Sequence, residues 1–419
     1  MHVPQRIAKF PGLILCFTAV TVYFALVSVQ YLAYHLSKKI DLKSLKLAIR
    51  LEPGNAEYQY KLADAFSRKS SLPEALNAFH QATKLNPHVA KYWIRLASAN
   101  RSLGLVQAER DAVQKAIAAD PKNPEIAWVA GNLYKFDGDT HSAFAALRTA
   151  FEGDPSLSGQ VIELCWQMRP DLDTLLQVIP ATAPAYSEFL EFLISKKETA
   201  SAAKVWVQMV GLGQPLQQNA VFDYIRYLVG QQEPEAARLV WHQAGPLGGL
   251  DKYQPSPANL IVNGDFSLDI LDGGFGWAYA RRPGVALQLD PTAPHLGSRS
   301  LLISYDSRGL DDSGILQLIP VEPDSAYHFS AYFKTRDLEG AGGPRFLLRD
   351  FYTGESYFES DDLKDSSVWK PVSGDLKTGP QTRLLVLQIE RVPSGAAIRG
   401  NLWIDGLGLA PVAIPASDP

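Results

Sequence analysis

The stretch NPHVAKYWIRLASANRSLGLVQAERDAVQKAIAADP, residues 86–121, sets the period of the N-terminal half of this 419-residue chain. It begins with Asn followed by Pro and ends with Asp followed by Pro, and similar dipeptides recur outside it. The four prolines are Pro53, Pro87, Pro121 and Pro155, so successive prolines are 34 residues apart. Pro lacks a backbone N–H and disfavours helix in the residue before it, so each dipeptide predicts the end of a helix.

Small residues also recur with this period. Ala63, Ala97 and Gly131 stand one period apart, and small side chains allow paired helices to approach closely. Over residues 41–155 the chain therefore resembles the tetratricopeptide repeat family, whose unit is a 34-residue helix–turn–helix. Asn100 and Glu109 depart from that pattern, because an aromatic residue and an Ala are typical at these positions.

The repeat continues more faintly beyond residue 155. Ala202-Ala203 and Ala236-Ala237 are again 34 residues apart, which predicts degenerate helical repeats. We assign residues 41–245 to one helical solenoid, clear to 155 and degenerate after it. The resemblance implies a concave face that binds a protein partner. The alternative is an array that acts only as a spacer.

The N-terminus contains 28 residues without a formal charge, between Lys9 and Lys38. A membrane-spanning helix needs about 20 apolar residues. We therefore predict a short tail over 1–10 and a transmembrane helix over 11–36. The alternative is a cleaved signal peptide, although the apolar region of such a peptide is shorter.

A Gly- and Pro-rich segment, 246–257, predicts a linker, and the hydrophobic period changes after it. Apolar residues then alternate with more polar ones, as in Tyr327, Phe329, Ala331 and Phe333, and in Leu385, Leu387 and Ile389. Alternation over short segments separated by turns predicts an all-β jelly-roll sandwich over 258–411, followed by a tail over 412–419.

The sandwich resembles carbohydrate-binding modules of the galactose-binding-like type. The resemblance rests on Asn263-Gly264-Asp265-Phe266, on Trp277 and on Trp403-Ile404-Asp405-Gly406. It implies polysaccharide binding and, as in several such modules, a structural calcium ion held by Asp265 and Asp405. Calcium takes six to eight oxygen ligands, so the alternative is that both carboxylates only cap turns.

Sugar sites combine aromatic rings, which stack on pyranose faces, with polar groups that orient the hydroxyls. The candidates are Tyr332, Arg349, Trp277, Tyr352 and Trp369. Tyr332 and Arg349 lead because each is out of phase with the apolar face of its own strand. For every aromatic residue the alternative is a place in the core.

Composition narrows the functional classes. The net charge is −4, which gives no basic footprint for nucleic acid. Residues 258–411 hold 20 acidic and 14 basic residues, a net charge of −6. The two cysteines form no disulfide framework, and no zinc-site spacing or catalytic motif occurs. We therefore expect a protein that is not an enzyme.

The expected fold is multidomain: a transmembrane helix, an all-α solenoid and an all-β sandwich. The expected function is a membrane-anchored scaffold that binds a protein partner and a polysaccharide, in envelope or exopolysaccharide handling. Two alternatives are a structural protein whose sandwich binds no sugar and a targeting subunit of a separate enzyme. The lysines after the span favour a cytoplasmic location, but long domains translocate largely regardless of charge. The implied glycan leads us to place the soluble part outside the cytoplasm.

Overall fold

The computed structural model describes residues 10–412, so the predicted tails 1–10 and 412–419 lie outside the described residues except at their inner ends. The chain divides into two compact units, Met1–Pro180 and Ala181–Pro419. The predicted linker, 246–257, lies within the second unit.

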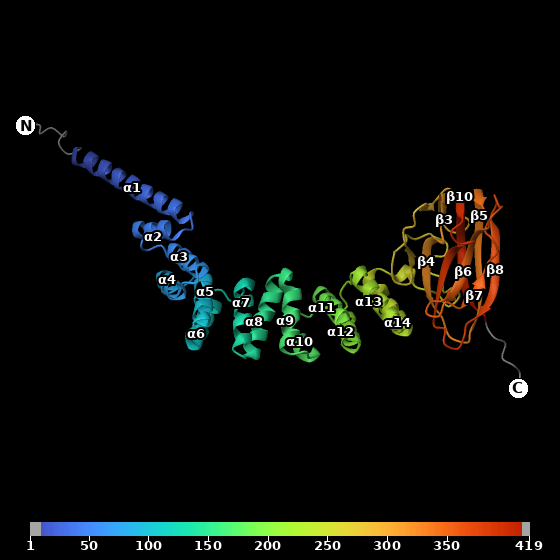
Figure 1. Ribbon diagram of the computed structural model, residues 1–419, viewed down its shortest axis with the longest axis horizontal. Helices are drawn as coiled ribbons and strands as arrows, with labels where there is room; N and C mark the ends of the chain where they lie inside the picture. Colours follow the sequence, from blue (N-terminus) through green and yellow to red (C-terminus); the bar gives the residue numbers. More distant parts are fainter. Residues whose placement is uncertain (1–9, 413–419) are drawn as a thin grey trace, which may run out of the picture. The chain divides into compact units, whose positions relative to one another are not determined.

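The first helix, α1 (Phe10–Ser37), covers the predicted span (Figure 1). Its segment Leu13–Ser37 is long and apolar enough to cross a membrane, and a signal sequence would have the same properties. Its side chains are exposed from Leu13 to Leu32, whereas Ala33 is buried against Ala48 and Tyr58. The helix therefore offers an apolar surface and joins the following helices only at its C-terminal end.

The rest of the first unit is a series of packed helical pairs. The helices are α2 (Leu42–Leu51), α3 (Ala56–Arg68), α4 (Leu72–Leu85), α5 (Ala90–Ser102), α6 (Val106–Ala119), α7 (Pro124–Phe136), α8 (Thr140–Gly153), α9 (Ser158–Met168) and α10 (Leu172–Val178), with a 3-10 turn at Pro155–Leu157. The starts of α3, α5 and α7 are 34 residues apart, as are those of α4, α6 and α8. Glu52, Asn86, Asp120 and Asp154 cap the C-termini of α2, α4, α6 and α8. The expected fold of tetratricopeptide-type helical pairs is confirmed.

Close packing between paired helices depends on the small residues. Ala63 and Ala97 are fully buried. A Cβ atom added to Gly131 of α7 would lie 2.8 Å from Cγ of Leu147 in α8, which is itself fully buried. A larger side chain at 131 therefore has no space without separating the two helices.

The second unit begins with two further pairs: α11 (Ala183–Ser195) with α12 (Thr199–Gly211), and α13 (Gln218–Gly230) with α14 (Pro234–Gly248). Here the spacing of 34 was wrong. The buried residues Ala202, Val205 and Trp206 of α12 correspond to Ala237, Val240 and Trp241 of α14, a separation of 35. The matching Ala-Ala dipeptides misled the alignment, because burial decides which residues are equivalent.

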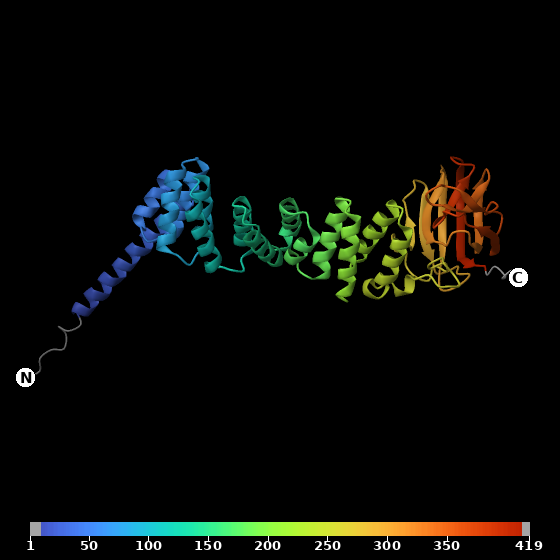
Figure 2. The ribbon, with the colours of Figure 1, turned by 90° about the horizontal axis from the view of Figure 1, so that it is seen from below.

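The sandwich consists of two five-stranded antiparallel sheets (orange to red in Figure 2). The strands are β1 (Trp277–Tyr279), β2 (Val285–Asp290), β3 (Ser300–Gly309), β4 (Asp312–Pro320), β5 (Ala326–Gly340), β6 (Gly343–Asp350), β7 (Ser356–Glu359), β8 (Lys370–Lys377), β9 (Leu384–Val392) and β10 (Ala397–Pro411). One sheet has the order β1-β4-β9-β6-β7 and the other β2-β3-β10-β5-β8. The predicted inward residues of β5, from Tyr327 to Phe333, are buried, but in β9 Leu384 and Val386 are buried as well.

The sandwich packs directly on the last helical pair. A Cβ atom added to Gly273 would lie 2.4 Å from the Phe222 ring, and one added to Gly274 would lie 2.2 Å from the Trp241 ring. The indole N–H of Trp241 donates to the carbonyl of Tyr253 at 3.1 Å. The predicted linker is thus partly helix and partly a packed turn. The outer face of β4 looks toward α13 across a cavity of about 570 Å³.

Two buried polar side chains interrupt the core of the second repeat. Asn100 and Glu109, the two departures seen in the sequence, are each 1% exposed. The carbonyl oxygen of the Asn100 side chain and both carboxylate oxygens of Glu109 have no hydrogen-bond partner. Arg101 is the nearest cation, 3.5 Å from the Glu109 carboxylate. Burial, followed by the negative charge of Asp137, raises the pKa of Glu109, while Arg101 and Arg110 lower it.

We predict that Glu109→Gln stabilises the chain at pH 8. A carboxyl whose pKa is raised by folding stabilises the fold when protonated, and this contribution is lost as pH rises above the ordinary value of 4.5. Removing the charge should raise the free energy of unfolding by roughly 1–3 kcal/mol at pH 8. The gain should shrink below pH 4.5. Thermal unfolding followed by circular dichroism measures both effects.

The exposed Glu74 of α4 provides the control, because Glu74→Gln should change stability little at either pH. A Glu109→Gln variant that melts below the parent chain at pH 8 would contradict the prediction.

Candidate functional site

Aromatic and cationic side chains gather on the outer face of the sheet that contains β5. We call His295, Tyr332, Lys334, Arg336, Trp369 and Trp403 the aromatic platform. The His295 ring centroid lies 4.0 Å from that of Tyr332 and 5.2 Å from that of Trp369. Lys334 Nζ lies 5.1 Å from the Trp369 ring and 5.0 Å from the Trp403 ring. At the edges of the platform, Val368 is 67% exposed and Leu296 48%.

Strand register brings these residues together. Successive residues of a strand point to opposite faces, so the burial of Phe333 directs Tyr332 and Lys334 outward. In the pairing of β5 with β10, Lys334 lies opposite Trp403. Trp369 immediately precedes β8, whose first residue, Lys370, lies opposite Phe333. Three strands therefore contribute to one surface.

Two buried carboxylates hold the platform in place. Asp405 accepts hydrogen bonds from the backbone N–H groups of His295 at 2.7 Å and of Leu296 at 2.8 Å, and from that of Gly406. These bonds fix the loop that carries His295. Burial raises the pKa of Asp405, and the same backbone hydrogen bonds oppose that shift. Asp290 accepts from the Trp403 indole N–H at 2.7 Å.

The arrangement does not fit the calcium ion that the family resemblance implies. Asp265 accepts hydrogen bonds from the Ser267 hydroxyl at 2.7 Å and from the Ser267 backbone N–H, and both Asp405 oxygens accept backbone N–H groups. Within residues 10–412 no group of three His, Cys, Asp or Glu side chains could hold a metal ion. Calcium binding stays an untested prediction, and both carboxylates here act as turn caps.

The other predicted sugar-site residues lie elsewhere. Trp277 is 2% exposed and packs on Phe266 in the core, so its ring does not reach the surface. Arg349 lies in the opposite sheet and pairs with Glu390 at 3.0 Å. Tyr352 belongs to the helical junction, where its hydroxyl donates to the carbonyl of Val229 at 3.0 Å. Only Tyr332 and Trp369 of the five candidates come together.

The sequence reasoning missed His295, Lys334, Arg336 and Trp403. Lys334 and Arg336 follow the same alternation that selected Tyr332, so the strand pattern contained a signal for them. No comparable local signal exists for His295, because its position depends on Asp405, which is 110 residues away in the chain.

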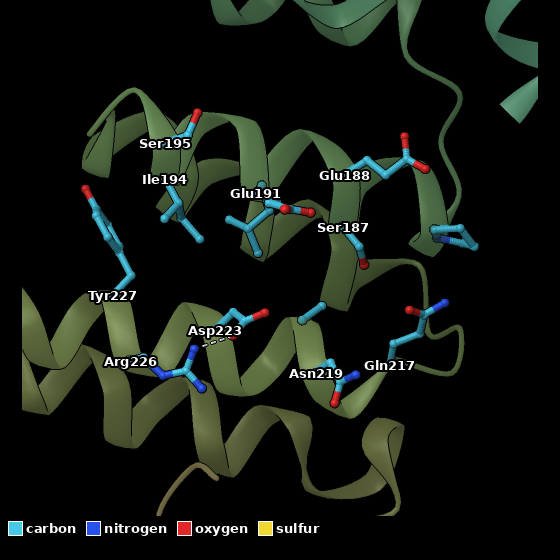
Figure 3. Close-up of a pocket in the computed structure, with 13 residues that line it drawn as sticks. Ser187, Glu188, Glu191, Ile194, Ser195, Gln217, Asn219, Asp223, Arg226 and Tyr227 are labelled. Atoms are coloured by element: carbon cyan, nitrogen blue, oxygen red, sulfur yellow. Dashed lines mark hydrogen bonds and ion pairs between the residues drawn. The ribbon is translucent and has the colours of Figure 1, made fainter. Parts of the chain in front are cut away.

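A second concave site lies between α11 and α13, the first helices of the two pairs in the second unit (Figure 3). Its volume is about 570 Å³, and Ile194 and Tyr227 are among its lining residues. Glu188, Glu191 and Asp223 also line it, and only Asp223 has a cation beside it, Arg226 at 2.7 Å. This groove therefore carries a net negative charge.

The comparisons with known proteins agree with the helical pattern. Residues 60–124 match the family model described as a tetratricopeptide repeat. No curated protein matches the chain. Among solved structures, the chain is similar to "MamA 41-end from Desulfovibrio magneticus RS-1" at 18% identity, with a TM-score of 0.32, covering 39% of this chain and 94% of that one.

Two similar structures are carbohydrate-binding modules. "CBM4 structure and function" is 15% identical, with a TM-score of 0.28, covering 36% of this chain and 99% of that one. The "CBM22-1 xylan-binding domain from Paenibacillus barcinonensis Xyn10C" is 17% identical, with a TM-score of 0.26, covering 36% of this chain and 93% of that one. Likenesses this low carry no argument about function, which rests on the residues themselves.

Proposed function

We propose that this protein is a membrane-anchored, non-catalytic scaffold whose sandwich binds polysaccharide through the aromatic platform. The observation that supports this most is the grouping of Tyr332, His295 and Trp369 on one sheet face, with exposed apolar side chains at its edges. Aromatic surface receives the C–H faces of pyranose rings, and neighbouring polar groups orient the hydroxyls. An open surface of this kind suits a long polymer better than a small molecule.

We predict that Trp369→Ala weakens polysaccharide binding by about fivefold or more, because truncation of a central aromatic residue commonly costs over ~1 kcal/mol. Tyr332→Ala should act in the same direction. The measurement is affinity electrophoresis of the full-length chain in detergent against gels containing neutral and acidic polysaccharides.

Arg349→Gln is the matched control, because Arg349 lies on the opposite sheet and should leave binding unchanged. An absence of binding to every polysaccharide would favour the structural reading of the sandwich. An effect of Arg349→Gln equal to that of Trp369→Ala would move the site to the other face.

The helical groove between α11 and α13 is our proposed site for a protein partner. Glu188 and Glu191 leave it negatively charged, which favours a basic, extended peptide segment. We predict that Glu188→Gln with Glu191→Gln lowers the affinity for Lys-rich peptides on an array severalfold, since each exposed ion pair contributes ~0.2–1 kcal/mol. Glu74→Gln is the control. Equal binding of Lys-rich and Glu-rich peptides would refute this role for the groove.

For the anchor, we predict that the full-length chain stays in the membrane fraction after alkaline carbonate extraction. The physical reason is the exposed apolar surface of α1. We place the rest of the chain outside the cytoplasm, where a C-terminal alkaline phosphatase fusion would be active. A soluble form shortened near Lys38 would identify α1 as a signal sequence, and a fusion partner active only in the cytoplasm would reverse the orientation.

A further inference from the structure

Two cations of the aromatic platform have no counter-ion within the chain. Lys334 lies over the Trp369 and Trp403 rings, and the Arg336 guanidinium carbon lies 5.2 Å from the Trp403 ring centroid. Among residues 10–412, neither side chain has a carboxylate within ion-pair distance, although most arginines of the sandwich do: Arg282 with Asp312, Arg299 with Asp269, Arg345 with Glu359 and Asp362, Arg349 with Glu390, and Arg399 with Glu339.

This lack of neutralisation contrasts with the composition of the domain. Residues 258–411 carry 20 acidic and 14 basic residues, so carboxylates are in excess. The two acidic residues nearest the platform do not offset its charge at the surface. Asp290 is 8% exposed and bonded to the Trp403 indole, and Asp405 is fully buried and bonded to backbone N–H groups. The solvent-facing charges of the platform are therefore those of Lys334 and Arg336.

A cation held against an aromatic face keeps its charge available to a ligand on the same surface. A neutral glycan needs hydrogen-bonding groups beside the rings and gains little from two such cations. A glycan with a carboxylate on each sugar, or on alternate sugars, would place a negative charge beside a pyranose ring that rests on the same platform. Such a ligand uses both components of the surface.

We infer that the platform selects an acidic polysaccharide that carries uronate carboxylates, with Lys334 and Arg336 as its specificity-determining residues. This inference rests on the proposed polysaccharide-binding function and narrows it to one class of ligand. Trp369 and Tyr332 supply affinity for the sugar rings, and the two cations discriminate charged from neutral polymers.

The test compares polygalacturonate with its fully methyl-esterified form, because esterification removes the charge and keeps the same sugar ring. Alginate serves as a second acidic polymer, and xylan and dextran as neutral ones. With the full-length chain in detergent at low salt, at least one acidic polymer should bind about tenfold more tightly than the methyl ester and the neutral polymers. The preference should vanish near 1 M salt, where the Debye length is about 3 Å.

Lys334→Gln with Arg336→Gln should abolish this preference and leave binding to neutral polymers unchanged. A control variant, Lys252→Gln with Arg281→Gln, removes two exposed cations that lie outside the platform, and it should keep the preference. Equal binding of acidic and neutral polymers, or a preference lost equally in both variants, overturns the inference and leaves the proposed function intact. Failure to bind any polymer overturns the proposed function itself.

Discussion

The packing of the Trp241 ring against the loop at Gly274 and Phe275 determines which face of the sandwich is open. The rings of Trp241 and Phe275 meet edge to face, with centroids 6.0 Å apart. Gly274 has a φ of +61°, and a Cβ atom there would lie 2.2 Å from the indole, so the contact requires glycine. This contact sets the last helical pair against the sheet that contains β4, and the outer face of the other sheet stays exposed.

That asymmetry gives the two sheets different roles. In the sheet beside the helices, polar residues such as Arg349 and Tyr352 make contacts within the chain. In the open sheet, hydrogen bonds to Asp405 and Asp290 hold the platform residues from below. Buried carboxylates are costly unless they are fully hydrogen-bonded. Here their bonds fix the His295 loop and the Trp403 indole before any ligand arrives, and an ordered surface loses less entropy on binding.

The helical array shows a second consequence of local packing. Neighbouring repeats place Phe66 with Ala75 and Tyr134 with Ala143 where the second repeat has Asn100 with Glu109. An aromatic ring against Ala fills space between paired helices, whereas the polar pair leaves buried oxygens without partners. Because each repeat packs mainly on its neighbours, the array tolerates one weak unit as long as the adjacent pairs are well packed.

The sequence by itself determined the features that follow from backbone geometry. A Pro after each capping residue ended the helices, the 34-residue period placed the helical pairs, and the alternation of Tyr327, Phe329, Ala331 and Phe333 gave the inward face of β5. These signals are local, because helix and strand periodicities act over a few residues. They also pointed to Tyr332 as an outward residue.

Only the tertiary structure decided which aromatic residues form a surface. Trp277 and Trp369 look alike in sequence, yet one lies in the core and the other on the platform. The 35-residue spacing of the last two helical pairs depended on which side chains are buried, which the matching Ala-Ala dipeptides concealed. The platform exists because strand register and the Asp405 hydrogen bonds bring together residues that are far apart in the chain. No local pattern encodes contacts over such separations, since they depend on how whole strands pair and which sheet face remains uncovered.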